Sequence, residues 1–459
     1  MYKADSKIAE EFIDHQEILD TLEYAHNNKS NRALIEQLID KAAQFKGLSH
    51  REAALLLECD QPDLTERIFR LAQEIKHKFY GNRIVMFAPL YLSNYCVNGC
   101  VYCPYHLKNK TIARKKLTQE EIRKEVIALQ DMGHKRLALE AGEDPLRNPI
   151  EYILESIQTI YSIKHKNGAI RRVNVNIAAT TVENYRKLKD AGIGTYILFQ
   201  ETYHKENYES LHPTGPKSKY AYHTEAMDRA MEAGIDDVGL GVLFGLNTYR
   251  YDFTGLLMHA EHLEATFGVG PHTISVPRIC PADDIFCKIV AVIRIAVPYT
   301  GMIISTRESA ATRRKVLNLG ISQISGGSRT SVGGYAIPET PEENSAQFDI
   351  SDTRTLDEVV NWLLDLGHIP SFCTACYRAG RTGDRFMSLV KSGQIANCCA
   401  PNALMTLKEY LEDYAAPDTR AKGIQLIKKE LEHIPNPKIK EIAIRNLKEI
   451  EEGKRDFRF

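Results

Sequence analysis

The first 80 residues repeat apolar side chains at the spacing of amphipathic helices. Ser49 and Glu52 have the spacing of a capping box, which marks the start of a helix. Nothing in this segment has catalytic spacing, so we expect residues 1–80 to form a helical cover over the rest of the chain. The apolar positions that carry the pattern are Ala53, Leu56, Leu57, Leu64, Ile68, Leu71 and Ile75.

From Arg83 onward the sequence pattern changes to short runs of strand-forming residues that alternate with helical segments. This alternation also fits a doubly wound sheet, but eight strands and eight helices over about 250 residues favour a (β/α)8 TIM barrel. The predicted fold class is therefore α/β, with a helical extension before the barrel. The eight strands are expected at residues 84–89, 136–140, 173–178, 196–201, 237–243, 273–278, 302–306 and 321–325.

Start and stop signals place several helices between these strands. Thr118 and Glu121 form a second capping box, and a glycine follows each of three helical segments. The apolar run 289–304 contains Arg294 and Pro298 and is too short to span a bilayer, so it predicts a buried helix followed by a buried strand. The glycine-terminated helices are expected at 118–132, 181–191 and 221–233, and a further helix at 356–366.

Composition excludes several classes of function. The chain has 459 residues and a net charge of −1, so no basic field indicates nucleic-acid binding. Residues 1–16 lack the apolar core of a signal peptide, and we expect a cytoplasmic protein without a membrane partner. Ten cysteines in a reducing compartment indicate metal binding rather than disulfides.

Three of these cysteines follow the first strand in a C-x3-C-x2-C spacing. Cys96, Cys100 and Cys103 supply three thiolates, whereas a cubane cluster has four irons, so one iron is left open for a ligand that is not protein. The alternative is a zinc knuckle with His106 as the fourth ligand. An open iron indicates a catalytic cluster.

A second cysteine group lies near the end of the chain. Cys373, Cys376 and Cys399 give C-x2-C-x22-C, and spacing alone does not choose between Cys399 and its neighbour Cys398. The alternative is a structural zinc with His368 as the fourth ligand. We predict three regions: a helical cover at 1–80, the barrel at 81–340, and a mainly helical auxiliary-cluster domain at 341–459.

Polar residues and glycines recur where the predicted strands end, which is where barrel enzymes place their active sites. Two arginines at the mouth are suited to bind a substrate carboxylate, although ion pairs between loops are an equal alternative. The candidates are Gly142, Glu143, Glu201, Gly241, Arg307, Ser328 and Arg329.

His272 precedes the sixth strand and is a candidate iron ligand, since a neutral imidazole binds metal well. A structural, hydrogen-bonded histidine is the alternative. Three rivals lie in the same region of the chain: His204, His259 and His262.

The first cysteine motif, with Tyr102 before its last cysteine, resembles the radical S-adenosylmethionine (SAM) superfamily. This resemblance implies that Cys96, Cys100 and Cys103 hold a [4Fe-4S] cluster and that SAM binds its open iron. It further implies SAM contacts by the ring of Tyr102 and by Gly142, Glu143, Glu201 and Gly241.

The motifs at 200–204, 305–308 and 325–330 resemble the aromatic amino acid lyases of the radical SAM superfamily. With the C-terminal cysteines added, the chain resembles the tyrosine lyases that mature [FeFe]-hydrogenase. The resemblance implies cleavage of L-tyrosine at Cα–Cβ to p-cresol and dehydroglycine, then CO and cyanide, and assembly of an Fe(CO)2(CN) unit. It implies two [4Fe-4S] clusters, SAM and an additional iron with a cysteine ligand. It also implies an electron donor and other hydrogenase maturation proteins as partners.

The same resemblance implies roles for individual residues. Arg307, Ser328 and Arg329 would bind tyrosine, the family spacing favours Cys399 over Cys398, and His272 would hold the extra iron.

Two other functions stay open at this point. The related 2-iminoacetate synthase of thiamine biosynthesis is the same lyase without the CO chemistry, but it lacks the C-terminal cysteines. A non-catalytic iron–sulfur carrier would not need ordered motifs at the ends of eight strands.

Overall fold

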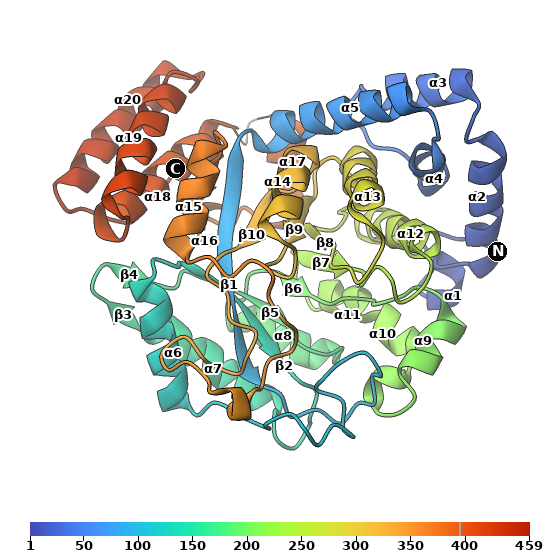
Figure 1. Ribbon diagram of the computed structural model, residues 1–459, viewed down its shortest axis with the longest axis horizontal. Helices are drawn as coiled ribbons and strands as arrows, with labels where there is room; N and C mark the ends of the chain where they lie inside the picture. The colour runs from blue at the N-terminus through green and yellow to red at the C-terminus, as the bar shows by residue number, and fades with distance from the viewer. Residues whose placement is uncertain (394–395) are drawn as a thin grey trace.

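The computed structural model describes residues 1–393 and 396–459. Its N-terminal helices lie along one end and side of the molecule (Figure 1). The capping box of Ser49 and Glu52 is present at the start of α4, and α5 packs against barrel helices α13 and α14. The predicted N-terminal helical extension is confirmed as α1 (Ala9–Phe12), α2 (His15–Asn28), α3 (Arg32–Ala42), α4 (His50–Glu58) and α5 (Pro62–Tyr80).

Eight parallel strands close into a barrel, because β10 pairs with β1 as well as with β9. All eight predicted strands are confirmed, although β6 is shorter than expected. The strands are β1 (Arg83–Ser93), β2 (Arg136–Ala141), β5 (Arg172–Asn176), β6 (Tyr196–Ile197), β7 (Val238–Gly241), β8 (Thr273–Ser275), β9 (Gly301–Ile304) and β10 (Gln323–Ser325).

Helices surround the barrel, and a small antiparallel pair, β3 (Lys164–His165) and β4 (Gly168–Ala169), follows α7. The capping box of Thr118 and Glu121 is present, and helices begin directly after Thr118 and Thr181 as predicted. The helices are α6 (Gln119–Asp131), α7 (Ile150–Ser162), α8 (Val182–Asp190), α9 (Lys205–Leu211), α10 (Tyr220–Thr224), α11 (Ala226–Glu232), α12 (Tyr249–Phe267), α13 (Asp283–Ala296) and α14 (Ala310–Leu319).

The single helix predicted at 221–233 is wrong, since α10 and α11 are separate. At the break, Glu225 has ψ near 10°, outside the helical range, and its carboxylate accepts a hydrogen bond of 3.0 Å from the backbone N–H of Ala9. A contact with the N-terminal segment therefore interrupts a sequence that is locally suited to one helix.

The predicted buried helix and strand at 289–304 are present as α13 and β9. Arg294 is fully buried on α13, yet its guanidinium donates to the carbonyl oxygens of Pro298 and Thr300 at 2.8 and 2.7 Å and to that of Gly320 at 2.7 Å. A buried cation is tolerated where its donors are satisfied, and here it joins the end of a helix to the start of a strand.

The C-terminal region contributes a ninth parallel strand that the sequence did not predict. β11 (Ile369–Ser371) pairs with the first three residues of β1. The other elements here are helical: η2 (Pro341–Glu343), α15 (Leu356–Asp365), α16 (Ala375–Arg378), α17 (Gly383–Lys391), α18 (Ala396–Asp413), α19 (Pro417–Leu431) and α20 (Pro437–Glu451). The division of the chain at residues 80 and 340 stays a prediction.

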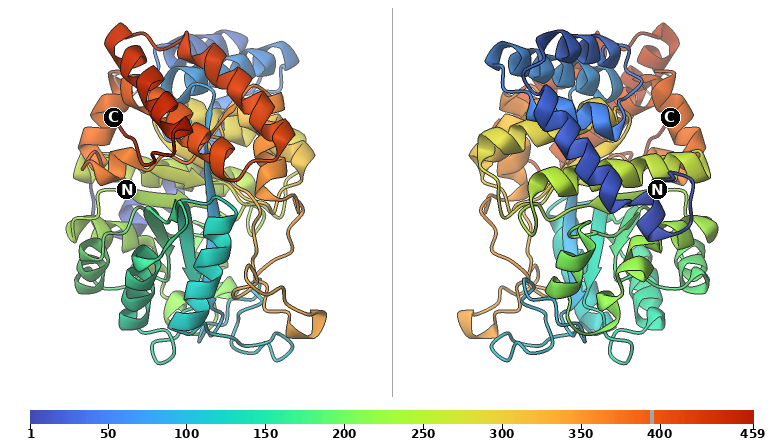
Figure 2. Two further views of the ribbon diagram at one scale, coloured as in Figure 1. Left: turned by 90° about the vertical axis from the view of Figure 1, so that its left-hand side faces the viewer. Right: turned by 90° about the vertical axis from the view of Figure 1, so that its right-hand side faces the viewer.

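The loops that follow the barrel strands gather at the lower end of the molecule in Figures 1 and 2. They include the loop after β1, the short helix η1 (Pro216–Ser218) and the segment around η2. The part of the chain that the structure describes contains no helix long and apolar enough to cross a membrane.

Candidate functional site

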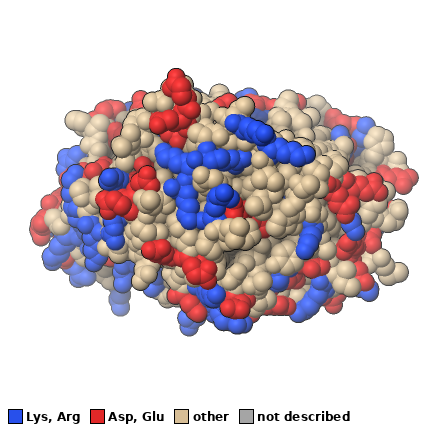
Figure 3. Space-filling model, turned by 90° about the horizontal axis from the view of Figure 1, so that it is seen from below, with Lys and Arg blue, Asp and Glu red and all other residues tan. Residues whose placement is uncertain are grey.

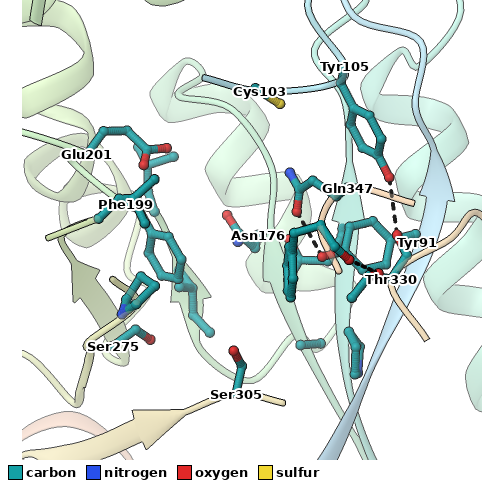
Figure 4. A pocket seen from close by; sticks show the side chains of 18 of the residues that line it. Tyr91, Cys103, Tyr105, Asn176, Phe199, Glu201, Ser275, Ser305, Thr330 and Gln347 are labelled. Carbon is teal, nitrogen blue, oxygen red and sulfur yellow. Dashed lines mark hydrogen bonds between the residues drawn. The ribbon is translucent and has the colours of Figure 1, made fainter. Parts of the chain in front are cut away.

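A cavity of about 630 Å³ opens where the barrel strands end. Side chains from all eight barrel strands or the loops after them line it, so residues far apart in sequence meet around one space (Figure 4). Several of the predicted residues are among them: Cys96, Cys100, Tyr102, Cys103, Gly142, Glu143, Glu201 and Arg307.

The loop after β1 brings the three cysteines to this cavity. Its backbone is fixed by hydrogen bonds from Val97 N to Glu143 O at 2.8 Å and from Gly99 N to Thr214 O at 2.9 Å. The side chain of Asn98, which the sequence reading missed, donates to Glu143 Oε2 at 2.6 Å. Two neighbouring loops, one with Glu143 and one with Thr214, therefore hold the cysteine loop in one conformation.

Burial raises the pKa of the Cys100 thiol to about 12 and that of Cys103 to about 11. Both thiols are therefore protonated at neutral pH without metal, and iron binding would release protons. The three sulfur atoms are not grouped within 4.8 Å of one another in the described chain, whereas thiolates on one tetrahedral zinc lie about 3.8 Å apart. His106, the fourth ligand of the zinc alternative, does not line the cavity.

Gly142 lies against the cysteine loop with no space for a side chain. A Cβ there would be 2.4 Å from the carbonyl oxygen of Tyr95 and 3.2 Å from Cys96 Cβ. Asn148 Nδ2 donates to both Tyr95 O at 3.0 Å and Gly142 O at 2.8 Å, which binds the two backbones together. Glycine is required here by this close approach of backbone to backbone.

Two carboxylates reach the same cavity from different strands. Burial raises the pKa of Glu143 above its usual value. Glu201 has a positive φ of 70°, a strained conformation for a residue with a side chain, and such strain is common at functional sites. Its Oε1 lies 2.8 Å from Lys217 Nζ, a cation that the sequence reading missed.

The predicted aromatic contact is also placed at the cavity. Tyr102 lines it, with its hydroxyl 2.9 Å from His212 Nε2. Gly241 does not line the cavity, since a Cβ at Gly241 would meet the ring of Phe199 at 2.4 Å. Gly241 thus makes room for Phe199, which does line it.

Of the three predicted substrate-binding residues, the structure brings only Arg307 to the cavity. Its guanidinium is stacked 4.0 Å from the centre of the Phe348 ring, and burial lowers its pKa from the usual value. Arg329 is exposed and Ser328 is buried, but neither lines the cavity. After the left-handed turn at Gly327 (φ 60°), the backbone N–H of Arg329 donates to Tyr335 Oη.

Polar groups that the sequence reading missed lie in the cavity opposite Glu201 (Figure 4). Tyr91 Oη donates to Gln347 Oε1 at 2.8 Å, and both residues line the cavity, as does Asn176. Glu140 is another lining residue, and burial raises its pKa well above the usual value. Gln347 comes from the polar segment after residue 340, so this segment folds over the mouth of the barrel.

A second, smaller cavity of about 90 Å³ lies where the barrel strands begin. Cys373, Cys376 and Cys399 line it together with His272, so the structure brings together the four residues predicted for the second site. Four arginines also line it: Arg83, Arg136, Arg172 and Arg381.

Within residues 1–393 and 396–459, Cys376, Cys398 and Cys399 form the one group of three or more metal-ligating side chains whose ligand atoms lie within 4.8 Å of one another. Cys376 Sγ and Cys399 Sγ are 4.0 Å apart, close to the spacing of about 3.8 Å around a single tetrahedral ion. The zinc alternative also requires His368, which does not line this cavity.

His272 is buried, and burial lowers its pKa to about 4, so the imidazole is neutral and able to bind metal. Its Nδ1 lies 3.3 Å from Asp237 Oδ1 without the geometry of a hydrogen bond. The rivals are placed elsewhere, since His204, His259 and His262 line neither cavity.

The two cavities occupy successive levels of the barrel. Strand residues 85, 136, 172 and 301 line the small cavity, and residues 87, 138, 174 and 303, two positions further along the same strands, line the large one. Because alternate residues of a strand face the same side, both levels face the barrel interior. Gln323 lines both cavities.

Two family models match the chain: the radical SAM superfamily over residues 90–253 and the biotin and thiamin synthesis associated domain over residues 275–369. The 2-iminoacetate synthase of Salmonella typhimurium is 30% identical over 344 residues, which is 72% of this chain and 89% of that protein.

Two solved structures resemble almost the whole chain. A crystal structure of HydG, a maturase of the [FeFe]-hydrogenase, is 55% identical with a TM-score of 0.94, and the match covers 98% of this chain and all of that one. The maturase HydG from Carboxydothermus hydrogenoformans is 39% identical with a TM-score of 0.83, over 96% of this chain and all of that one.

Proposed function

The chain belongs to the HydG family of radical SAM enzymes, and from this premise we propose that it cleaves L-tyrosine at Cα–Cβ to p-cresol and dehydroglycine. Dehydroglycine then yields CO and cyanide, which are assembled with iron into an Fe(CO)2(CN) unit for the [FeFe]-hydrogenase. The observation that carries this proposal is the likeness to HydG over 98% of the chain, cysteine-bearing C-terminal region included.

Radical SAM enzymes use a [4Fe-4S] cluster and SAM, and the residues at the large cavity fit this pair. Three cysteines line one side of it, and their spread exceeds what one zinc ion needs. Gly142 lines the cavity beside this loop, where its carbonyl oxygen could accept a further hydrogen bond from a ligand's amino group. Bound together, the cluster and SAM supply a 5′-deoxyadenosyl radical by one-electron cleavage of the sulfonium C–S bond.

The chain's own residues would orient SAM and exclude water from it. Glu143 is fixed by Asn98, and Glu201 by Lys217, so both carboxylates are held before any ligand binds. Such preorganisation matters because a primary carbon radical reacts with whatever lies nearest. Tyr102 would flank the nucleoside from the cysteine loop.

Tyrosine would occupy the remainder of the cavity between SAM and Arg307. The planar guanidinium of Arg307 is able to donate two hydrogen bonds to one carboxylate, which would fix the amino-acid end of the substrate. The polar side chains of Tyr91, Asn176 and Gln347 offer partners for the phenol at the same mouth. Ser328 and Arg329 are not needed for this arrangement.

We further assign the small cavity to the second half of the reaction. Cys373, Cys376 and Cys399 would hold an auxiliary [4Fe-4S] cluster, and His272 would bind the additional iron, the cargo that receives CO and cyanide. Products formed in the large cavity have a short path along the barrel axis, since Gln323 borders both spaces.

The test is anaerobic reconstitution with iron and sulfide, followed by SAM, dithionite and tyrosine. We expect p-cresol, 5′-deoxyadenosine, CO and cyanide. Formation of p-cresol without CO or cyanide would instead favour the chemistry of the 2-iminoacetate synthases, with which this chain shares 344 aligned residues. Absence of SAM cleavage would favour an iron–sulfur carrier and refute the proposal.

A further inference from the structure

Half of the ten large apolar side chains that the described residues expose lie at the end of the barrel that carries the first cysteine loop. These five lie in loops that follow barrel strands, and Leu146 is 89% exposed. Exposed apolar groups clustered on one face are typical of protein interaction sites. They are Val101, Leu107, Leu146, Ile279 and Ile337.

The same face carries exposed positive charge. Lys108 and Lys110 are exposed, and their ammonium groups have no hydrogen bond or ion pair among the described residues. Arg147, next to Leu146, is also exposed, and its ionic partner Asp144 is buried beneath it. The whole chain has a net charge of −1, so this basic character is local.

Figure 3 views this lower face directly. Lys and Arg side chains gather across the upper middle of this view among uncharged residues, with acidic side chains around them. A surface of this kind attracts a negatively charged partner and repels a positively charged one.

The loop that presents the lysines is held firmly. Arg114 donates to four carbonyl oxygens around it: Asn94 at 2.6 Å, Tyr105 at 2.8 Å, His106 at 2.7 Å and Asn109 at 3.3 Å. A preorganised surface loses little conformational entropy when a partner binds.

This surface also lies directly over the proposed cluster site. Cys100 is 6% exposed, but its chain neighbour Val101 is 59% exposed, so one residue separates a cluster ligand from solvent. Leu107 is tied to the loop by its backbone N–H, which donates to Asn98 O at 2.8 Å. An electron can therefore enter here over a short distance.

We propose that this surface, defined by Val101, Leu107, Lys108, Lys110, Leu146 and Arg147, docks a small acidic electron-transfer protein. The inference rests on the cluster assigned to Cys96, Cys100 and Cys103. In each encounter the donor is oxidised by one electron and the cluster is reduced by one, with no bond formed or broken between the proteins.

A partner that collects the iron-bound product would instead approach the second cysteine group at the other end of the barrel. Redox encounters are characteristically small and transient, and steering by surface charge governs their rates. The proposed surface fits such an encounter, because it offers a few apolar side chains for contact together with exposed positive charge for steering.

The experiment compares two reductants on the reconstituted full chain. The double variant Lys108→Glu/Lys110→Glu reverses the charge of the proposed surface. The matched control is Lys428→Glu/Lys429→Glu, since those two lysines are also exposed and unpaired, on α19. The reductants are dithionite and a reduced acidic flavodoxin at subsaturating concentration and low salt, with 5′-deoxyadenosine as the product measured.

We expect the Lys108/Lys110 variant to lose about 10-fold or more of its rate with flavodoxin and to keep its rate with dithionite, because rim charges mainly change the rate of association. Titration calorimetry with oxidised flavodoxin should show weaker binding for this variant alone. Salt should slow the flavodoxin reaction of the wild type more than that of the variant.

A second variant, Leu146→Asp, tests the apolar part of the proposed surface. Because Leu146 is exposed, this change should not disturb folding. Its flavodoxin-driven rate should fall while its dithionite-driven rate is kept. Flavodoxin rates and affinities equal to wild type in both surface variants would overturn the proposal, as would equal losses with both reductants. Failure to form p-cresol with dithionite would count against the proposed function instead.

Discussion

Replacing Gly142 by alanine tests whether the contact between the loops after β1 and β2 positions the cluster site. The new Cβ would lie 2.4 Å from Tyr95 O, and a Cβ is essentially never closer than 3.0 Å to a non-bonded heavy atom. One backbone must therefore move by at least about 0.6 Å. The obstacle is backbone, so no flexible side chain can relieve it.

Asn148 prevents the two loops from simply separating, because its Nδ2 donates to carbonyl oxygens of both. Moving the loops apart would cost part of this arrangement, in addition to about 1–3 kcal/mol for overpacking. A displacement approaching 1 Å at a reacting group lowers a rate by up to about 100-fold. We expect SAM cleavage by Gly142→Ala to fall between about 10- and 100-fold.

The assay is 5′-deoxyadenosine formation with dithionite, together with iron content and thermal unfolding. Gly326→Ala is the matched control, since its Cβ would meet only side-chain carbons, Met86 Cε at 3.1 Å and Leu356 Cδ1 at 3.2 Å. It should lose stability without a comparable loss of SAM cleavage. Wild-type SAM cleavage by Gly142→Ala would refute the reasoning.

Further predictions concern the second site, the substrate and pH. Product analysis of Cys399→Ala should show p-cresol but no CO, whereas Cys398→Ala should have only a small effect on CO formation. The reverse result would make Cys398, and not Cys399, the cluster ligand. Arg307→Ala should raise the KM for tyrosine by about 10- to 150-fold, equivalent to about 1.5–3 kcal/mol. Arg329→Ala should leave the KM unchanged, because Arg329 is exposed outside the cavity. Equal KM values in the two variants would contradict this. Burial lowers the pKa of His134 to about 4 in the folded protein, whereas a histidine in an unfolded chain has a pKa of about 6.5. Between these two pH values the unfolded state binds one more proton than the folded state. The stability of the fold should therefore fall as the pH drops from 6.5 to 4. His134→Gln should weaken that dependence by up to about 3 kcal/mol at pH 4, measured as the slope of Tm against pH, and an unchanged slope would refute it.

The barrel was predictable because its information is local and repeated. Eight apolar runs, most of them followed by a helix with a cap or a terminal glycine, specify strand, turn and helix without knowledge of the tertiary structure. The break at Glu225 was not predictable, because it depends on the N–H of Ala9, far away in the chain. β11 was missed since three residues, one of them a proline, carry too little pattern.

The candidate site was predictable where the chemistry is contained in a motif. Cys96, Cys100 and Cys103 are spaced for one loop, and Cys373 and Cys376 for another. Lys217 and Gln347 reach the large cavity from segments with no motif, so only the fold reveals them. Arg307 and Arg329 each follow a strand in similar motifs, and the difference in their exposure depends on the local turn, which sequence spacing does not report.

The pairing of β11 with β1 has a mechanical consequence for a two-site enzyme. The first residues of β1 are hydrogen-bonded to β11, and the last residue of β11 lies two residues before Cys373. β1 itself ends three residues before Cys96. From Val85, which pairs with Ser371, to Ser93, this strand thus separates the two cysteine groups by about 26 Å, at about 3.3 Å per residue. Apart from a register shift between Tyr91 and Ser93, β1 is hydrogen-bonded along its length, and such a strand does not stretch or hinge as a linker does. The distance that a small diffusing molecule must cover is consequently a constant of the backbone, which loop insertions or drift in surface packing leave unchanged.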